Sequence, residues 1–384
     1  MNQMPRKKID TDLLFGVLCL LAFGLVMIYS TTIMKQGSNV LKLQMAYIAA
    51  SIIIVRFLFE IPLWWWAKFS KPLFIVVTVL LVIAGFSRPI NGASRWIHLP
   101  FFNIQPSELF KFWVILYIAD FFQRRSEALA DVKRTMFVGI LPTIGVCVTM
   151  FLTKDLGSSI VVLMILTVML YLVKIPIKLL FKIGMAVLPI IVLFMVVTGR
   201  LHRFVSASSP FDDPYGHGAQ AVGSLLSIHS GASLGNGFGS GFGNGIFKNG
   251  FLPESHNDFI FAVIADELGW IGATLLVVAY IWLCYRIVKI AATARNLKLY
   301  FNSFVGFGIS ILIAMQCLVH IGVNFGILPN KGLTLPFISY GGSSTFVMIL
   351  CVMFVLRIDY ENRQTKLGYD VSRPKSHHFA ANNS

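Results

Sequence analysis

Long apolar runs alternate with short polar segments over most of the chain. Each run approaches the roughly 20 residues that a helix needs to cross a bilayer. The alternation predicts about ten membrane-spanning helices, although several runs are shorter and predict only the centre of a helix. The runs are Leu13 to Tyr29, Gln44 to Phe59, Leu73 to Phe86, Leu109 to Phe122, Met136 to Leu152, Ser159 to Leu172, Leu179 to Thr198, Phe259 to Ile281, Phe304 to Val323 and Thr345 to Leu356.

Composition supports this interpretation. Of 384 residues, 56% are hydrophobic and 13% charged, and the mean hydropathy is +0.76. This is more apolar surface than a soluble core can bury, so we expect an all-α polytopic membrane protein. The first run follows MNQMPRKKIDTD without a small-residue cleavage site, which predicts an uncleaved span rather than a signal peptide. The five cysteines lie in apolar runs without metal-ligand spacing, so we expect neither disulfides nor zinc.

The net charge of +15 is spread over alternate polar segments. Lysine and arginine collect in the cytoplasmic loops of membrane proteins, so an even number of spans with both termini cytoplasmic fits the pattern. Nucleic-acid binding is not expected, because orientation in the membrane accounts for the basic charge. We expect one integral membrane domain over residues 1–356 and a basic, disordered cytoplasmic tail over residues 357–384.

Three longer polar segments then lie on the outer side, and the residues that suit chemistry collect there. They are Ser87 to Ser107, Gly199 to Asn257, which is the largest and lies between the seventh and eighth spans, and Asn324 to Ser344. Trp96 suits a segment lying in the membrane interface.

Phe251 to Gly272 is the stretch around which the candidate chemistry gathers. It passes from a polar loop into an apolar run with Asp258 at the junction. A carboxylate at the mouth of a membrane helix is costly, so a functional role is the default interpretation. Every third or fourth residue after Asp258 is alanine or glycine as far as Gly272, which predicts one small-residue helix face beneath the acid.

Two other groups of charged residues have open interpretations. Glu108 and Lys111 are three residues apart at the head of an apolar helix, so they are expected to pair, either as a staple between helices or as part of a site. Asp155 and Gly157 indicate either a broken helix with polar groups facing a cavity or a simple turn.

The remaining loop residues also have two interpretations each. The glycines between Gly231 and Gly250 suit either a flexible loop or a backbone cradle for phosphate, but they match no nucleotide-binding fingerprint. Lys331 either binds a ligand or extends toward lipid headgroups. His256 either shares a proton with Asp258 or is a structural hydrogen-bond partner, and no second ligand lies at zinc spacing.

Five segments taken together resemble the SEDS family of bacterial membrane proteins, which includes FtsW, RodA and SpoVE. They occur in the family's order and span nearly the whole chain, and the last is more similar to FtsW than to RodA. The segments are NGASRWI, QPSELFK, KDLGSS, GFLPESHNDFIFAVIADELG and GVNFGILPNKGLTLPFISYGGSS.

The resemblance implies a peptidoglycan glycosyltransferase that polymerises lipid II at the outer face of the bacterial cytoplasmic membrane. It implies a class B penicillin-binding protein and other divisome membrane proteins as partners, and a location at the division septum. The family's essential acid in Glu-x-His-x-Asp-Phe falls on Asp258. The resemblance places other site residues of the family on Arg95, Trp96, Glu108, Lys111 and Lys331. Further candidates for substrate binding or charge stabilisation lie in the same segments: Asp155, Glu254, His256 and Ser339.

The chain departs from the family pattern at three places, so no role is carried over to Lys154 or to the long loop. It has Thr153-Lys154 where Gln-Pro is common, Asp266 where glutamate is common, and His217-Gly218-Ala219-Gln220 where Gly-Tyr-Gln is commoner.

Transfer from a lipid pyrophosphate needs a base for the acceptor hydroxyl and positive charge for the leaving group. We therefore expect Asp258 to be the base of an inverting transfer. Arg95, Lys331, Lys111 or a divalent cation such as Mg²⁺ would stabilise the pyrophosphate. Three alternatives stay open: a lipid II flippase, a non-catalytic scaffold that activates a penicillin-binding protein, and a RodA-like role in elongation.

Overall fold

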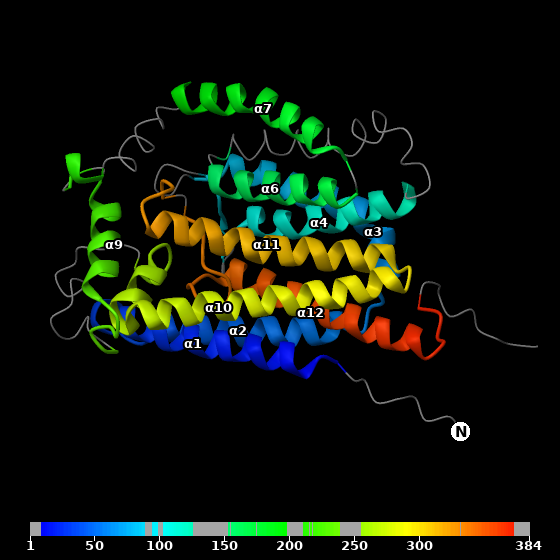
Figure 1. Ribbon diagram of the computed structural model, residues 1–384, viewed down its shortest axis with the longest axis horizontal. Coiled ribbons are helices and arrows are strands. Elements are labelled where there is room, and N and C mark those ends of the chain that lie inside the picture. Colours follow the sequence, from blue (N-terminus) through cyan, green and yellow to red (C-terminus); the bar gives the residue numbers. More distant parts are fainter. Residues whose placement is uncertain are drawn as a thin grey trace, which may run out of the picture.

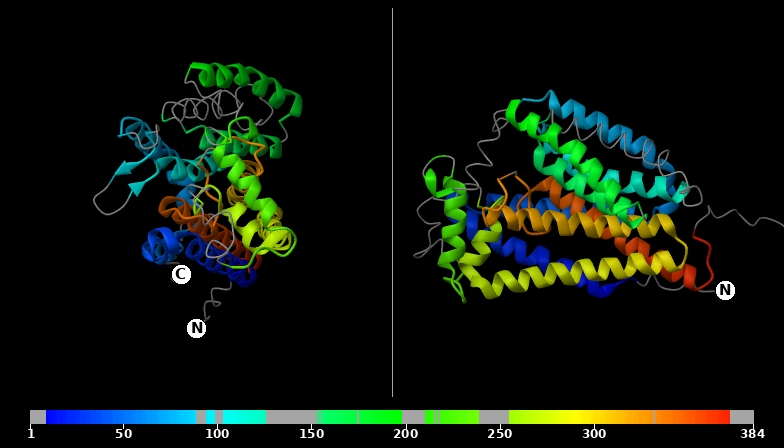
Figure 2. Two further views of the ribbon diagram at one scale, coloured as in Figure 1. Left: turned by 90° about the vertical axis from the view of Figure 1, so that its left-hand side faces the viewer. Right: turned by 45° about the horizontal axis from the view of Figure 1, so that its top comes forward.

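The computed structural model describes most of the chain as a bundle of long helices (Figures 1 and 2). It describes residues 9–88, 94–98, 103–125, 153, 155–173, 175–197, 210–214, 216, 218–238, 255–330 and 332–371. The helices are α1 (Thr11–Gln36), α2 (Asn39–Leu58), α3 (Leu63–Gly85), α4 (Pro106–Arg125), α6 (Leu156–Leu172), α7 (Ile177–Val197), α9 (Ala219–Ser230), α10 (Ile260–Asn296), α11 (Tyr300–Asn324) and α12 (Gly342–Lys366), with a short 3₁₀ turn, Pro210–Asp212.

The predicted fold class is confirmed, whereas the number of spans stays a prediction. Six described helices are long and apolar enough to cross a membrane: α1, α2, α3, α10, α11 and α12. α4 has the length but carries charges along its 20 residues, and α6 has only 17 residues. The predicted span from Met136 to Leu152 lies outside the described residues.

Burial separates central helices from peripheral ones. In the apolar window of α12, 72% of residues are buried, and in α11 61%, against 17% in α2. A helix that is apolar on all sides and buried belongs to the core, whereas an apolar and exposed one faces lipid. α11 and α12 therefore form the centre of the bundle, and α7 lies at its edge beyond α6 (Figure 1).

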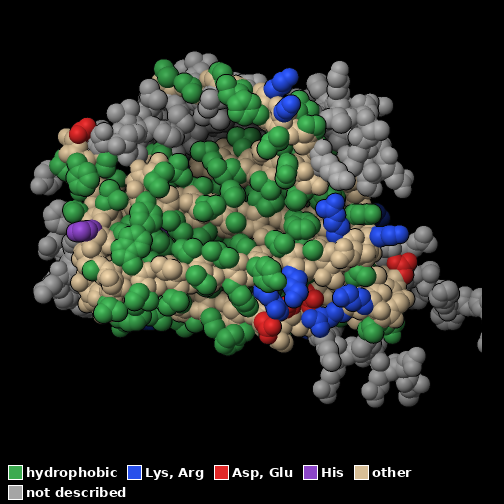
Figure 3. Space-filling model, in the orientation of Figure 1, with side chains coloured by type: hydrophobic (Ala, Val, Ile, Leu, Met, Phe, Trp, Pro, Cys, Tyr) green, Lys and Arg blue, Asp and Glu red, His purple; other side chains and the backbone are tan. Residues whose placement is uncertain are grey.

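One end of the bundle, here called the basic end, carries Lys68, Arg124, Arg286, Lys298 and Arg363. The chain enters α1 and leaves α12 at this end, and lysine and arginine side chains gather toward it while hydrophobic side chains cover most of the rest of this face (Figures 1 and 3). The arrangement agrees with the cytoplasmic orientation predicted for the basic loops.

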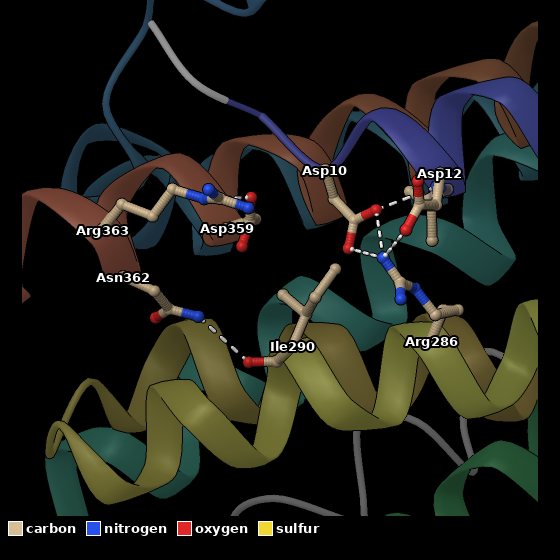
Figure 4. Close-up of polar contacts among 8 residues, drawn as sticks. Asp10, Asp12, Arg286, Ile290, Asp359, Asn362 and Arg363 are labelled. Atoms are coloured by element: carbon tan, nitrogen blue, oxygen red, sulfur yellow. Dashed lines mark hydrogen bonds and ion pairs between the residues drawn. The ribbon is translucent and has the colours of Figure 1, made fainter. Parts of the chain in front are cut away.

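Polar contacts fasten the helices to one another at the basic end (Figure 4). Asp10 caps α1 by accepting from the Leu13 amide at 2.9 Å, and Arg286 of α10 donates to its carboxylate at 2.6 Å. Asn362 of α12 donates to the Ile290 carbonyl of α10 at 3.0 Å. Contacts of this kind hold α1, α10 and α12 in register.

Several helices extend beyond the apolar runs that predicted them. α10 continues to Asn296, and α12 continues to Lys366. The added turns of α12 carry ion pairs four residues apart, Arg357 with Glu361 at 3.0 Å and Arg363 with Asp359 at 2.8 Å. Such pairs stabilise a helix without adding hydrophobicity, so an apolar window misses them.

The predicted continuous small-residue face below Asp258 is wrong. α10 begins at Ile260, after Asp258, and Gly269 breaks it with φ 66° and ψ −171°. The segment that follows α9 fills this break with backbone hydrogen bonds. The amides of Asn236 and Gly237 donate to carbonyls of α10 at 2.9 and 3.0 Å, and the Trp270 amide donates to the Ala232 carbonyl at 2.9 Å. A helix break at membrane depth is tolerated where its backbone groups are satisfied in this way.

Part of the segment from Ser87 to Ser107 is a small hairpin. β1 (Ile97–His98) pairs antiparallel with β2 (Asn103–Ile104), with Ile97 opposite Ile104. No strand was predicted here, because two-residue strands leave no hydrophobic alternation to detect. The hairpin follows Arg95 and Trp96 directly and leads into α4.

Candidate functional site

Arg95 and Asp258 come together around Gly332, at the end of the bundle opposite the basic end; we call this end the site end. A Cβ atom placed on Gly332 would lie 3.3 Å from Arg95 Nη1 and 3.8 Å from Asp258 Oδ2. The two charged groups are far apart in the sequence, because Arg95 precedes α4 and Asp258 follows α9. Gly332 has φ 67°, a conformation that favours glycine, and the absent side chain leaves room for both groups.

Asp155 is a second carboxylate near the Arg95 guanidinium. It caps α6, where its Oδ1 accepts from the Ser158 amide at 3.3 Å, and it is 1% exposed. Burial raises the pKa of Asp155, but the Arg95 guanidinium and hydrogen bonds from Ser107 and Ser158 outweigh it and lower the pKa below its ordinary value. Asp155 is therefore ionised at neutral pH and holds positive charge beside it. The structure favours a buried helix start over a simple surface turn.

Glu108 and Lys111 form the predicted pair inside the bundle. Lys111 Nζ lies 2.7 Å from Glu108 Oε1, and the two side chains are 0% and 4% exposed. Glu108 Oε2 has no hydrogen-bond partner within the part of the chain that the structure describes. A buried ion pair contributes little net stability, yet losing one partner is costly.

Asn324, at the end of α11, positions the backbone around Asp258. Its Nδ2 donates to the Asp258 carbonyl at 3.1 Å, and its Oδ1 accepts from the Ala262 amide at 2.9 Å. Asn324 is fully buried, so these hydrogen bonds are not exchanged for water. This residue was not among those predicted from the sequence; the available signal was a polar amide closing an apolar run.

The loop before α12 is tied to the same segment. Ser339 Oγ donates to the Asn257 carbonyl at 2.8 Å and accepts from the Leu335 amide at 2.8 Å. The Tyr340 amide donates to the His256 carbonyl at 3.1 Å, and the rings of Tyr340 and His256 lie 5.7 Å apart. The contacts of Ser339 are thus with backbone, and they place the loop against the Asp258 segment.

Asn330 shapes the turn that carries Gly332. Its Oδ1 accepts from the Gly332 amide at 3.0 Å, while its Nδ2 donates to Gln220 of α9 at 3.0 Å. The turn is therefore anchored to α9. Neither Asn330 nor Gly332 was among the residues predicted from the sequence, although Asn-x-Gly is a recognisable turn signal.

The remaining predicted residues stand as follows. Trp96 is half-buried beside Arg95, at the start of the hairpin. Glu254 and Lys331 lie outside the described residues, as do all the glycines between residues 239 and 250. Of the glycines that are described, Gly231 and Gly235 face the backbone of α10, where an added Cβ would lie 1.9 and 2.2 Å from carbonyl oxygens. These two serve close packing.

The described side chains do not supply a ligand set for a divalent cation. Within the described ranges no three His, Cys, Asp or Glu side chains are grouped to hold a metal ion. At the site end the acids Asp155 and Asp258 are both near the Arg95 guanidinium, which already supplies positive charge. This chemistry suits an anionic ligand held by arginine.

The fold and the site define a multi-pass helical membrane protein with an acid and a guanidinium together at one end of the bundle. Residues 11–364 match the FtsW/RodA/SpoVE family, described as cell cycle proteins. The chain belongs to this family.

Curated relatives match over almost the full chain. A protein of Neisseria gonorrhoeae named as a probable peptidoglycan glycosyltransferase FtsW is 39% identical, with 95% of this chain and 87% of that protein covered. One of Nitrosomonas europaea with the same name is 35% identical, with 96% and 97% covered.

Solved structures share the fold. A chain from a peptidoglycan synthase complex that coordinates polymerisation and crosslinking is similar with a TM-score of 0.74 and 25% identity, covering 93% of this chain and 99% of that one. The crystal structure of the rod shape determining protein RodA of Thermus thermophilus is similar with a TM-score of 0.67 and 24% identity, covering 93% and 97%.

Proposed function

We propose that this chain is a peptidoglycan glycosyltransferase that polymerises lipid II, with Asp258 as the general base. The observation that carries the proposal is the meeting of Asp258 and Arg95 around Gly332 at one end of a membrane bundle. The names and the near-complete coverage of the curated relatives support the same activity.

The proposed reaction uses the two groups in one displacement. Asp258 accepts the proton of the acceptor GlcNAc 4-hydroxyl, and that oxygen attacks C1 of the donor sugar on its face opposite the pyrophosphate. The new C1–O bond forms as the C1–O bond to pyrophosphate breaks, and the bonding electrons leave with the pyrophosphate. The configuration at C1 is inverted. A positioned base of this kind contributes about 10²- to 10⁴-fold to a rate.

Arg95 is proposed to bind the departing pyrophosphate. A guanidinium offers several N–H donors in one plane, which suits phosphate oxygens. Asp155 is proposed as a positioning residue, because it holds Arg95 from the α6 side. Lys331 follows Asn330 and precedes Gly332 in the sequence, so it is a further candidate for binding phosphate. No step in this scheme is assigned to a metal ion.

The chain is proposed to act at the outer face of the bacterial cytoplasmic membrane, at the division septum. Its proposed partners are a class B penicillin-binding protein, which crosslinks the strands, and other divisome membrane proteins. The similarity to a chain of a peptidoglycan synthase complex supports an assembly with a crosslinking enzyme. The FtsW names of the relatives favour division over elongation.

The test is polymerisation of purified lipid II by the full-length chain together with a partner synthase whose own glycosyltransferase activity is disabled. Asp258→Asn is expected to lower the rate by about 10²- to 10⁴-fold while partner binding and thermal stability are retained. Asp213→Asn is the matched control, since it makes the same change at an exposed carboxylate outside the site.

Each rival function gives a different result. Equal polymerisation by wild type and Asp258→Asn would show that Asp258 is not the base. A scaffold would support its partner without making glycan itself, so neither form would polymerise with the disabled partner. A flippase would move labelled lipid II across liposomes without producing glycan strands.

A further inference from the structure

A cavity of about 340 Å³ lies at the basic end, far along the bundle from Asp258. It opens between the start of α3, the end of α4, the turn from α10 to α11 and the end of α12. This volume is at the lower end of the roughly 300 to 1,000 Å³ of ligand pockets. Its lining is Trp64, Ala67, Lys68, Asp120, Gln123, Arg124, Lys298, Leu299, Tyr300, Phe301, Asn302, Glu361 and Val371.

The cavity carries an excess of positive charge. Arg124 is paired with Asp120 at 2.7 Å. Glu361 accepts hydrogen bonds from Arg357 Nε at 3.0 Å and from Asn302 Nδ2 at 2.9 Å. Lys68 and Lys298 are exposed at the rim and are not paired with any acid that the structure describes. Two lysines without acidic partners suit a phosphate group.

Asp120 adds an acceptor to the same cavity. The residue is 2% exposed; its Oδ1 accepts from Arg124 Nε, but its Oδ2 has no hydrogen-bond partner in the described ranges. Buried carboxylate oxygens are almost always satisfied, and an unsatisfied one calls for a donor. A ligand with a phosphate and a nearby ammonium would supply an anion for the two lysines and a donor for Asp120 Oδ2.

The backbone at Lys298 supports a role for its side chain. Lys298 directly follows Leu297, the C-cap residue of α10, and has φ 61°; its amide donates to the Arg295 carbonyl at 3.0 Å in the turn that ends the helix. Glycine is the usual residue at this position, because a side chain is disfavoured where φ is positive. A lysine here places a cation at the cavity rim at a cost to the backbone.

We propose that this cavity binds the phosphoethanolamine headgroup of a membrane phospholipid. Lys68 and Lys298 would hold the phosphate, and the ammonium would donate to Asp120. Trp64 and Tyr300 line the same cavity, and aromatic side chains of this kind are typical of the membrane interface. Because the cavity opens at the ends of membrane helices, a lipid reaches it from the leaflet on that side, where basic pockets between helices bind headgroups.

The test is lipid binding to the purified full-length chain in detergent, measured by native mass spectrometry. Phosphatidylethanolamine is expected to bind more tightly than phosphatidylcholine, which has the same charges but no N–H donor, and than phosphatidylglycerol, which has no ammonium. Soluble O-phosphoethanolamine is expected to bind at least tenfold more weakly than the lipid, because it lacks acyl chains to bury.

Two variants separate the parts of the site. Lys298→Gly is expected to weaken phosphatidylethanolamine binding about fivefold, the typical contribution of one lysine near a membrane surface, without lowering thermal stability. Asp120→Asn is expected to remove the preference for phosphatidylethanolamine over phosphatidylcholine. Lys289→Gln is the control, since it removes an exposed lysine near the same end that does not line the cavity.

Three results would overturn the proposal. Equal binding of phosphatidylethanolamine and phosphatidylglycerol, unchanged in Asp120→Asn, would indicate a general anionic site. An equal loss of phosphatidylethanolamine binding in Lys298→Gly and Lys289→Gln would indicate that the basic surface as a whole attracts the lipid. Equal affinity for soluble phosphoethanolamine and for the lipid would exclude a lipid site. None of these measurements depends on glycosyl transfer.

Discussion

The two ends of the bundle place their charges by different means. At the basic end, ion pairs form within one helix or between helix ends, such as Arg357 with Glu361 and Arg286 with Asp10. At the site end, Arg95, Asp155 and Asp258 come from three distant segments and approach one another only in the folded chain. Charges at the basic end should therefore matter for stability, and charges at the site end for activity.

The largest expected loss of stability concerns Glu108 and Lys111, which pair within one helix, as at the basic end, but are buried inside the bundle. Glu108→Gln leaves the Lys111 ammonium buried without a counter-charge, which we expect to lower the free energy of unfolding by about 3 to 5 kcal/mol. Glu60→Gln is the control, because it removes the acid of the Arg56 pair, whose side chains are 66% and 47% exposed, and should cost about 0 to 1 kcal/mol. Denaturant unfolding in detergent measures both, and equal losses would contradict the comparison.

The next effect concerns activity at the site end. Gly332→Ala adds a Cβ beside Arg95 and Asp258, 3.3 Å from Arg95 Nη1, so the guanidinium has to shift slightly. We expect lipid II polymerisation to fall by roughly tenfold, less than the loss of about a hundredfold that a displacement of about 1 Å in a catalytic group causes. Gly37→Ala is the matched control, since Gly37 has φ 62° and no atom within 4 Å of an added Cβ. The Gly37 variant shows the cost of a side chain at a positive φ away from the site, so a similar loss of activity in both variants would remove Gly332 from the site.

A smaller effect is expected from the buried asparagines at the two ends, and the two variants can be compared directly. Asn324→Leu and Asn302→Leu each remove hydrogen bonds from a buried asparagine and should cost about 1 to 3 kcal/mol of stability. We expect only Asn324→Leu to slow polymerisation at a temperature where both variants are folded, because Asn324 holds the backbone of Asp258. Thermal unfolding and activity measured on the same samples decide this, and equal activity in both would refute the positioning role.

The smallest effect concerns the cap of α1. Burial raises the pKa of Asp10, but Arg286 and the Leu13 amide outweigh it, so the pKa lies below its ordinary value of 3.8. The stabilisation is therefore present above about pH 4 and is lost as the pH falls through the lowered pKa. Asparagine can still cap α1, but Asp10→Asn loses the ion pair with Arg286, so at pH 7 it should cost about 1 kcal/mol. Asp12→Asn, at a 68% exposed side chain, should cost less.

Thermal unfolding of wild type and Asp10→Asn between about pH 3 and pH 7 measures this effect, because the range spans the ordinary aspartate pKa of 3.8. The gap between wild type and Asp10→Asn should narrow toward the acidic end. A gap that stayed constant would show that the charge of Asp10 does not contribute.

Much of the fold could be predicted from the sequence, because apolar runs of membrane length leave little choice but helices. The ends of α10 and α12 could not, since their last turns are held by ion pairs and by contacts between helices. The break at Gly269 was missed for a similar reason: its backbone partners lie in the segment after α9, and Asn236 and Asp266 are 30 residues apart in the sequence.

The candidate site was predicted in part. Asp258 and Arg95 were both chosen from the sequence, and the structure brings them together. Gly332 and Asn324 were not, because a turn signal and a polar amide at the end of an apolar run do not by themselves show which residues they lie beside in the folded chain. The roles of all these residues stay predictions until the variants are measured.

The break in α10 has a consequence for how the chain tolerates change. Cβ atoms on Gly231 and Gly235 would collide with the carbonyls of Ala265 and Glu267, and one on Gly269 would lie 2.4 Å from the Gly235 amide nitrogen. The segment after α9 and the break in α10 pack backbone against backbone. A side-chain change in one of these segments therefore cannot make room for a side chain added to the other. In a library covering every single substitution, we expect these three glycines to be nearly invariant among functional clones, and the two segments to be exchangeable between relatives only together.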